Sequence, residues 1–79
     1  MFYTTVVFKD EETDTYIAYH PELNGCCVVG FTLQQAIDNL NRFREEDYIP
    51  HLKEHGLPVP YPMHSTPAVF QGSTERKRK

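Results

Sequence analysis

Hydrophobic and polar residues alternate in the first part of the chain. In residues 2–9 and again in residues 15–19, every second side chain falls on the same side of an extended backbone, and β-branched and aromatic residues dominate. The acidic segment 10–14 separates the two. Two alternating segments joined by a short polar loop predict a β-hairpin. A third apolar segment, residues 26–29, ends at Gly30 and predicts a third strand.

The hydrophobic period changes to that of a helix after Gly30. Thr32 and, three residues later, Gln35 match a capping box, so the helix is expected to begin there. Apolar residues then recur at helical spacing on one face, at Leu33, Ala36, Ile37, Leu40 and Phe43. The pattern predicts an amphipathic helix whose apolar face packs on the sheet.

A proline marks the expected end of this helix. Pro50 disfavours helical backbone at Ile49, so the helix is expected to stop or kink within residues 47–49. Pro50 also suits the first turn of a second short helix over residues 51–55, which Gly56 would close.

Three segments follow the helical region. Residues 57–62 carry a proline at every second position, which favours an extended polyproline II conformation. Residues 66–71 predict a fourth strand, and residues 72–79 predict a disordered basic tail. The chain of 79 residues is therefore expected to form one domain, residues 1–71, followed by a tail.

The order of the elements predicts a two-layer α+β domain of the type β-β-β-α-β. Three strands form an antiparallel meander, one main helix covers one face, and the fourth strand returns beside the first. Both faces look apolar, since one gathers Tyr3, Val7, Ile17 and Tyr19 and the other gathers Phe2, Val6, Phe8 and Tyr16. A single helix covers one face only, so we expect a homodimer.

The net charge of −3 divides unevenly along the chain. Residues 1–71 carry 10 acidic and 4 basic side chains, whereas the tail ends in the basic run 76–79. An acidic domain lacks the clustered Lys and Arg that phosphate contacts need, and it favours a basic protein as partner. The basic run either contacts nucleic acid or is a solvated tail.

The apolar runs and the cysteines indicate a cellular location. No apolar run is long enough to span a membrane, and the N-terminus lacks the basic segment of a signal peptide. Cys26 and Cys27 are adjacent and cannot pair with each other in normal geometry. We therefore expect a cytoplasmic protein with two reduced cysteines and no membrane contact.

Two groups of residues could suggest a metal site. His51 and His55 lie in an H-x-x-E-H pattern, which one group of zinc peptidases uses, but Pro50 and Gly56 confine this segment to little more than one helical turn. A carboxylate cluster for Mg²⁺ could come from Asp10, Glu11, Glu12, Asp14 and Glu22. Four of these acids share one flexible turn, whereas metal ligands converge from rigid elements. We interpret the first group as a solvated helix end and the second as a solvated hairpin tip, and expect no metal, cofactor or catalytic residue.

Residues 20–40 contain a series of spaced motifs. An extended strand is followed by Pro-Glu-Leu-x-Gly-Cys, a short strand, Gly-x-Thr, and a helix with an Ala and an Asn-Leu pair. The matching positions are Pro21, Glu22, Leu23, Gly25, Cys26, Gly30, Thr32, Ala36, Asn39 and Leu40. In this order and spacing the chain resembles the HicB-like antitoxin family, over about residues 2–70.

The resemblance implies a partial ribonuclease-H-like fold and a non-catalytic role. Family members bind and neutralise a small basic HicA-like toxin that cleaves mRNA, and an acidic domain suits such a partner. We expect the contacts to the partner at Asp10, Glu11, Glu12 and Asp14. The residues expected to serve as scaffold are Pro21, Glu22, Gly25, Gly30, Thr32 and Ala36.

The chain also departs from the family pattern. Many members carry a C-terminal DNA-binding domain, whereas only residues 72–79 follow the domain here, so we expect a short form without direct DNA binding. Two alternatives stay open. One is a stand-alone relative without a toxin partner, and the other is a metal-dependent nuclease or hydrolase on a ribonuclease-H-like scaffold.

Overall fold

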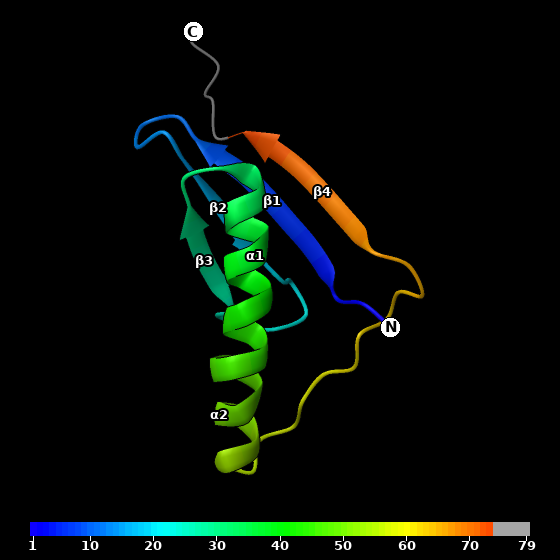
Figure 1. The fold of residues 1–79 in the computed structure, drawn as a ribbon. Helices are drawn as coiled ribbons and strands as arrows, with labels where there is room; N and C mark the ends of the chain where they lie inside the picture. The colour runs from blue at the N-terminus through cyan, green and yellow to red at the C-terminus, as the bar shows by residue number, and fades with distance from the viewer. Residues whose placement is uncertain (74–79) are drawn as a thin grey trace, which may run out of the picture.

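Four strands form one mixed sheet. The computed structural model describes residues 1–73, and its strands are β1 (Thr4–Asp10), β2 (Thr15–Tyr19), β3 (Cys27–Gly30) and β4 (Ala68–Ser73). Their order across the sheet is β3-β2-β1-β4, and only the pair β1–β4 is parallel (Figure 1). The α+β class is therefore confirmed, and the fourth strand lies beside the first as the sequence predicts.

The connection between β1 and β2 is a tight turn that its own residues stabilise. The Asp14 amide donates to the Asp10 carbonyl at 2.8 Å, and the Asp10 side chain accepts from the Glu12 amide at 3.1 Å. Asp14 has a φ of 58°, in the left-handed region that Asp tolerates better than most residues. The turn thereby reverses the chain without a glycine.

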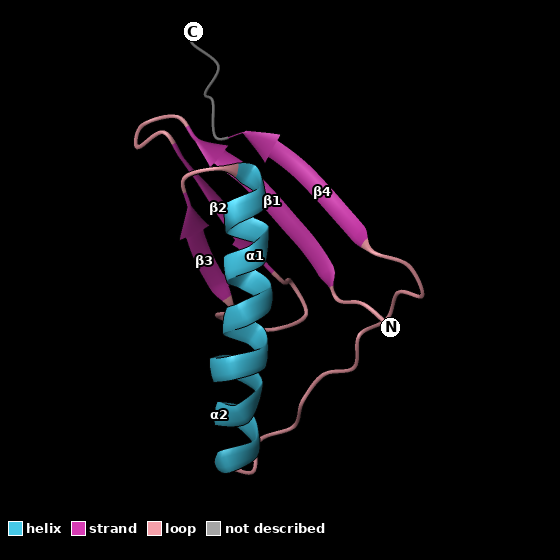
Figure 2. Ribbon diagram, in the orientation of Figure 1, coloured by secondary structure: helices cyan, strands magenta, loops and turns pink. Residues whose placement is uncertain are grey.

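One long helix lies across one face of the sheet, and Figure 2 shows it in front of the strands. It begins with α1 (Leu33–Phe43), where Thr32 is the N-cap and its hydroxyl accepts from the Gln35 amide at 3.0 Å. The Gln35 side chain in turn accepts from the Phe31 amide at 2.6 Å. These bonds satisfy amides that a helix start leaves without intrahelical partners.

The helix continues where a stop or kink is expected. After α1 it passes through a π-helical turn, η1 (Arg44–Tyr48), and on into α2 (Ile49–Glu54). The Ile49 amide donates to the carbonyl of Arg44, five residues back, and Ile49 keeps helical angles of φ −66° and ψ −43°. A π-helical turn is wider than an α-helical one, and it lets Pro50 enter the helix without ending it. The predicted stop at residues 47–49 is therefore wrong, whereas the predicted short helix that has Pro50 in its first turn and is closed by Gly56 is present as α2.

Gly56 ends the helix. It has a φ of 67°, and its amide donates to the Lys53 carbonyl at 3.1 Å. The Leu57 amide donates to the Leu52 carbonyl at 2.8 Å, which completes a Schellman motif. The proline-rich segment that follows contains no helix or strand and returns toward the N-terminus and β4 (Figure 1).

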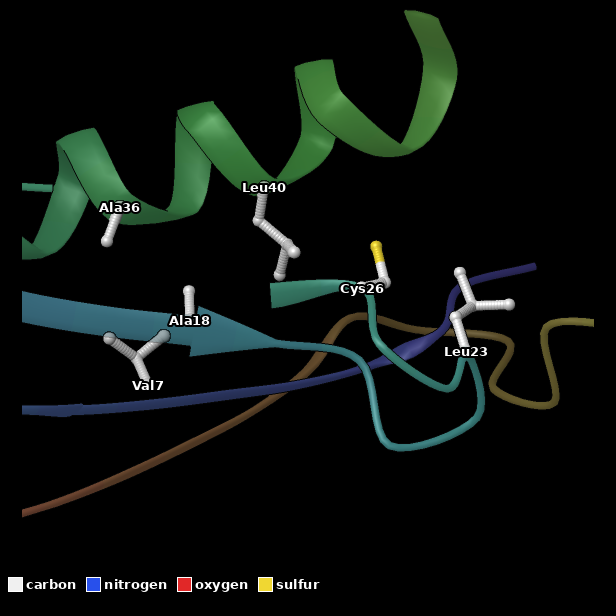
Figure 3. Close-up of a cluster of buried hydrophobic side chains, with 6 residues drawn as sticks. All are labelled: Val7, Ala18, Leu23, Cys26, Ala36 and Leu40. Atoms are coloured by element: carbon white, nitrogen blue, oxygen red, sulfur yellow. The ribbon is translucent and has the colours of Figure 1, made fainter. Parts of the chain in front are cut away.

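The core lies between the helix and the sheet. Figure 3 shows Ala36 and Leu40 of α1 pointing toward the sheet, with Val7 and Ala18 below them and Leu23 and Cys26 beside them. All six side chains are almost completely buried. The core is thin, as expected for a chain of this length, and two of its six members are alanines.

The helix and the sheet approach each other closely at Gly30. A Cβ atom at this position would lie 2.5 Å from the Ala36 amide nitrogen and 2.8 Å from the Ala36 Cα. Any side chain at position 30 would therefore push α1 away from β3. Glycine at position 30 and alanine at position 36 together set the distance between the two layers.

The register of the hairpin decides which side chains share a face. Because Asp10 is paired with Thr15, odd-numbered residues of β1 lie beside even-numbered residues of β2, as in the pair of Val7 and Ala18 under the helix. The two groupings expected from sequence, which placed Val7 with Ile17 and Tyr19 and placed Tyr16 with Val6 and Phe8, are therefore wrong. The face without the helix, called the open face below, carries Val6, Phe8, Ile17, Tyr19, Cys27, Val29, Ala68 and Phe70.

The fourth strand extends further than predicted. β4 covers residues 68–73 instead of 66–71, because β1 reaches Asp10 and offers backbone partners as far as Lys9. Gly72 and Ser73 are paired with Phe8 and Lys9, so the predicted tail begins too early in the sequence. The rest of the predicted tail, residues 74–79, lies outside the described residues.

Candidate partner-binding surface

The β1–β2 turn presents the acids that the sequence singles out. Glu11, Glu12 and Asp14 are exposed and Asp10 is half-buried, so all four lie at one tip of the sheet. Lys9 forms an ion pair with Asp14, with 3.0 Å between Nζ and Oδ1. This single lysine offsets part of the charge, and the tip remains acidic.

A second acidic surface lies on the helix, where the sequence predicts only a solvated face. Glu45, Glu46 and Asp47 are consecutive in η1, and all three are exposed. The Arg44 Nε donates to the Glu45 carboxylate at 2.9 Å, so Arg44 offsets the charge of Glu45. The run of three acids is visible in the sequence, and the structure adds that all three side chains are exposed.

The two acids most relevant to a nuclease lie far apart. Glu22 bonds Thr4 at the start of β1, with 3.0 Å from the Thr4 amide and 2.6 Å from the Thr4 hydroxyl to the carboxylate. Asp10 ends the same strand, six residues further, which corresponds to roughly 20 Å of extended chain. One metal ion cannot be bound by both carboxylates.

Glu22 anchors the start of β1. The Thr4 hydroxyl also lies 2.7 Å from the Nε2 of His64, which connects β1 to the segment before β4. Burial raises the pKa of Glu22, but the hydrogen bonds from Thr4 outweigh burial and leave that pKa below its ordinary value. The carboxylate is thus an acceptor that fastens three segments together.

A groove lies between the helix and the uncovered part of the sheet. α1 packs on β3, β2 and β1 but does not reach β4, which leaves a space of about 570 Å³. Its lining is mostly apolar and includes Phe2, Ile37, Ile49, Pro62 and Val69, with Arg44 as a charged member.

His20 and Arg44 form the polar side of this groove. The Nδ1 of His20 lies 2.8 Å from the Thr4 carbonyl, and its Nε2 lies 2.9 Å from the Arg44 guanidinium. A guanidinium only donates, so Nε2 accepts, Nδ1 carries the proton, and the ring is neutral. Burial lowers the pKa of His20, the bond to Thr4 opposes this, and the positive charge of Arg44 lowers it further.

The remaining candidate residues do not assemble a reactive site. His51 and His55 are both exposed, and their ring centroids are 4.4 Å apart. Cys26 is buried, and burial raises the pKa of its thiol to about 11, which disfavours the reactive thiolate. Within residues 1–73, no three His, Cys, Asp or Glu side chains lie close enough together to hold a metal ion.

The expected scaffold residues lie in the loop before β3, at the junction of β3 with α1 or in the first turns of α1, and of the six only Gly30 and Ala36 are buried. Gly25 has a φ of 83°, which a glycine adopts without strain, and Ala36 is fully buried on the side of α1 that faces the sheet. Pro21 is exposed in the same loop that positions Glu22.

Comparisons with known proteins do not extend this picture. Family models, curated proteins and solved structures were searched, and none matches the chain. Among the described residues, no helix has the length and apolar character needed to cross a membrane.

Proposed function

We propose that this chain is a non-catalytic protein-interaction module that binds and neutralises a small basic protein, as HicB-like antitoxins do with mRNA-cleaving HicA-like toxins. The observation that carries the proposal is the placement of the acids. They are gathered at the hairpin tip and on η1, both exposed, and are not convergent on one point. Exposed acids attract a basic partner over a distance and steer it into contact.

The strand order supports the same proposal. A mixed sheet in the order β3-β2-β1-β4, with one helix on one face, is the arrangement that the resemblance to a partial ribonuclease-H-like domain predicts. The motif residues Gly30 and Ala36 contact each other at the junction of helix and sheet, which fits the scaffold role that the resemblance assigns to them.

The rival proposal, a metal-dependent nuclease or hydrolase, has less support. Asp10 and Glu22 lie at opposite ends of β1, and Glu22 is already occupied by the amide and hydroxyl of Thr4. Metal-assisted hydrolysis needs carboxylates that converge on one ion from rigid elements.

The direct test is co-expression of the full chain with each reading frame that flanks its gene. If the proposal is correct, a small basic protein that halts growth when expressed alone becomes harmless in the presence of this chain and co-purifies with it in a fixed ratio. If neither flanking product binds, this chain is a stand-alone relative without a toxin partner, and the proposal fails. The expected setting is the cytoplasm, where mRNA is available to the partner.

Charge-reversal variants test which of the two acidic surfaces, the hairpin tip or η1, contacts the partner. Glu11→Lys with Glu12→Lys changes the tip, and Glu46→Lys with Asp47→Lys makes the same change of net charge on η1. We expect the tip variant to weaken binding to the co-purified protein at least tenfold and the η1 variant to weaken it less, measured by calorimetry at two salt concentrations. Equal losses would mean that only the overall charge matters, and a larger loss in the η1 variant would place the contact on the helix.

Self-association is independent of this partner. The homodimer that the sequence predicts depends on an uncovered apolar face, whereas binding of a basic protein depends on acids.

A further inference from the structure

One face of the sheet has no layer packed on it in the described chain. The helix covers the face of Val7 and Ala18, whereas the open face is covered by no helix or strand. Val29 and Phe70 expose 55% and 58% of their surface, although both belong to strands. Apolar strand residues that remain this exposed are typical of a surface that is buried in an assembly.

The middle of the open face is aromatic and uncharged. Phe8 and Tyr19 pack edge to face, with ring centroids 6.3 Å apart, and Val6 lies between Tyr19 on one side and Phe70 on the other. The cores of protein interfaces are enriched in aromatic residues and depleted of charges in the same way.

The acidic and imidazole side chains that border this face lie at its two ends. Asp10 stands at the hairpin end, and Glu22 with His64 stands at the opposite end, where both contact Thr4. A basic partner needs acids opposite its own charges, and the eight residues of the open face provide none.

We propose that a second copy of this chain covers the open face. Two acidic domains repel each other over most of their surfaces, and the uncharged open face is the surface that lets them approach closely. A two-fold axis places the same face on both sides, so an apolar uncharged surface meets an identical one. This inference does not depend on the proposed function, because the acidic tip touches the open face only at Asp10 and the groove lies on the side of the helix.

The small area of the open face indicates a weak dimer. Four strands about 4.8 Å apart, each with about five paired residues, make a surface of roughly 20 by 17 Å. Such an area belongs to the weaker class of specific interfaces. The dimer is therefore expected to be weak and to depend on protein concentration.

Two neighbouring residues of β4 give a matched test. Phe70 lies on the open face, and Val69 lies on the opposite face beside the groove, exposed by 44%. Sedimentation velocity of the full chain across the micromolar range is expected to show a shift from the chain mass of 9.2 kDa toward twice that mass. Phe70→Glu is expected to remain monomeric throughout, and Val69→Glu to dimerise like the wild type.

Three results would overturn the proposal. They are a wild-type chain that stays monomeric throughout, a Phe70→Glu variant that dimerises as well as the wild type, and a Val69→Glu variant that alone loses the dimer. The last result would place the interface at the groove or the outer edge of β4. Circular dichroism of both variants establishes that each is folded.

A second measurement needs no variant. Cys27 is exposed on the open face, whereas Cys26 is buried in the core and its raised pKa makes it unreactive. The rate at which iodoacetamide alkylates Cys27 is expected to fall several-fold as the protein concentration rises, while Cys26 stays unmodified. A Cys27 rate that is independent of protein concentration would contradict the dimer.

Discussion

His20 links the packing of the helix on the sheet to the protonation state of a buried side chain. Its ring is 2% exposed and bridges the Thr4 carbonyl of β1 and the Arg44 side chain of the helix. Protonation of Nε2 would remove its acceptor and place a second positive charge against Arg44. The folded chain therefore holds the ring neutral and lowers its pKa, mainly through burial.

Acid is expected to destabilise the protein through His20. Because the folded-state pKa is lowered, the unfolded chain binds more protons once the pH falls below about 6.5, the ordinary pKa of histidine, and stability is lost on acidification. Urea unfolding of the wild type is expected to show a falling free energy of unfolding from pH 7.5 to pH 5. The pKa of Glu22 is also lowered, so the stability that its bonds contribute is present over this pH range and is lost only at lower pH, below about 4.5, the ordinary pKa of the carboxyl.

Two variants separate His20 from the other histidines. His20→Asn is expected to be less stable at pH 7.5 but to lose less stability on acidification. His51→Asn, at an exposed position, is expected to keep the pH dependence of the wild type. A His20→Asn variant with an unchanged dependence would show that another group controls the response.

At the scale of elements, the contact between β3 and α1 controls the distance between the layers. Gly30→Ala would bring a Cβ to 2.5 Å from the Ala36 amide nitrogen, and overpacking of this kind costs about 1–3 kcal/mol. Gly72→Ala is a matched control, because a Cβ there meets no atom within 4 Å, and its effect should stay within about 0.5 kcal/mol. Thermal or urea unfolding measures both, and equal effects would rule out the close approach as the cause.

The elements differ in how much of them the sequence predicts. The start of the helix could be predicted, because the capping hydrogen bonds of Thr32 and Gln35 lie within one turn of the chain. The continuation of the helix through Pro50 could not be predicted, because it depends on a π-helical turn that the preceding residues form. The faces of β1 and β2 could not be assigned either, since a shift of one residue in the hairpin register exchanges all the side chains between faces.

At the scale of the whole molecule, three surfaces have separate roles in our account. The helix-covered face contains the core, the open face meets a second copy, and the acidic tip meets a basic partner. The acidic tip could be predicted from the sequence because it is a local run, 10–14. The acids of η1 are also a local run, whereas the groove could not be predicted, because it arises from the path of the long helix relative to β4.

The measurement that tests the central claim most directly is the rate of RNA cleavage. A small basic protein encoded beside this chain would be purified and its cleavage of mRNA followed while the full chain is added. Our account predicts that cleavage by the partner falls to background near equimolar amounts and that this chain alone cleaves nothing, with or without Mg²⁺ or Mn²⁺. Cleavage that the chain leaves unchanged, or metal-dependent cleavage by the chain itself that Asp10→Ala or Glu22→Ala abolishes, would contradict it.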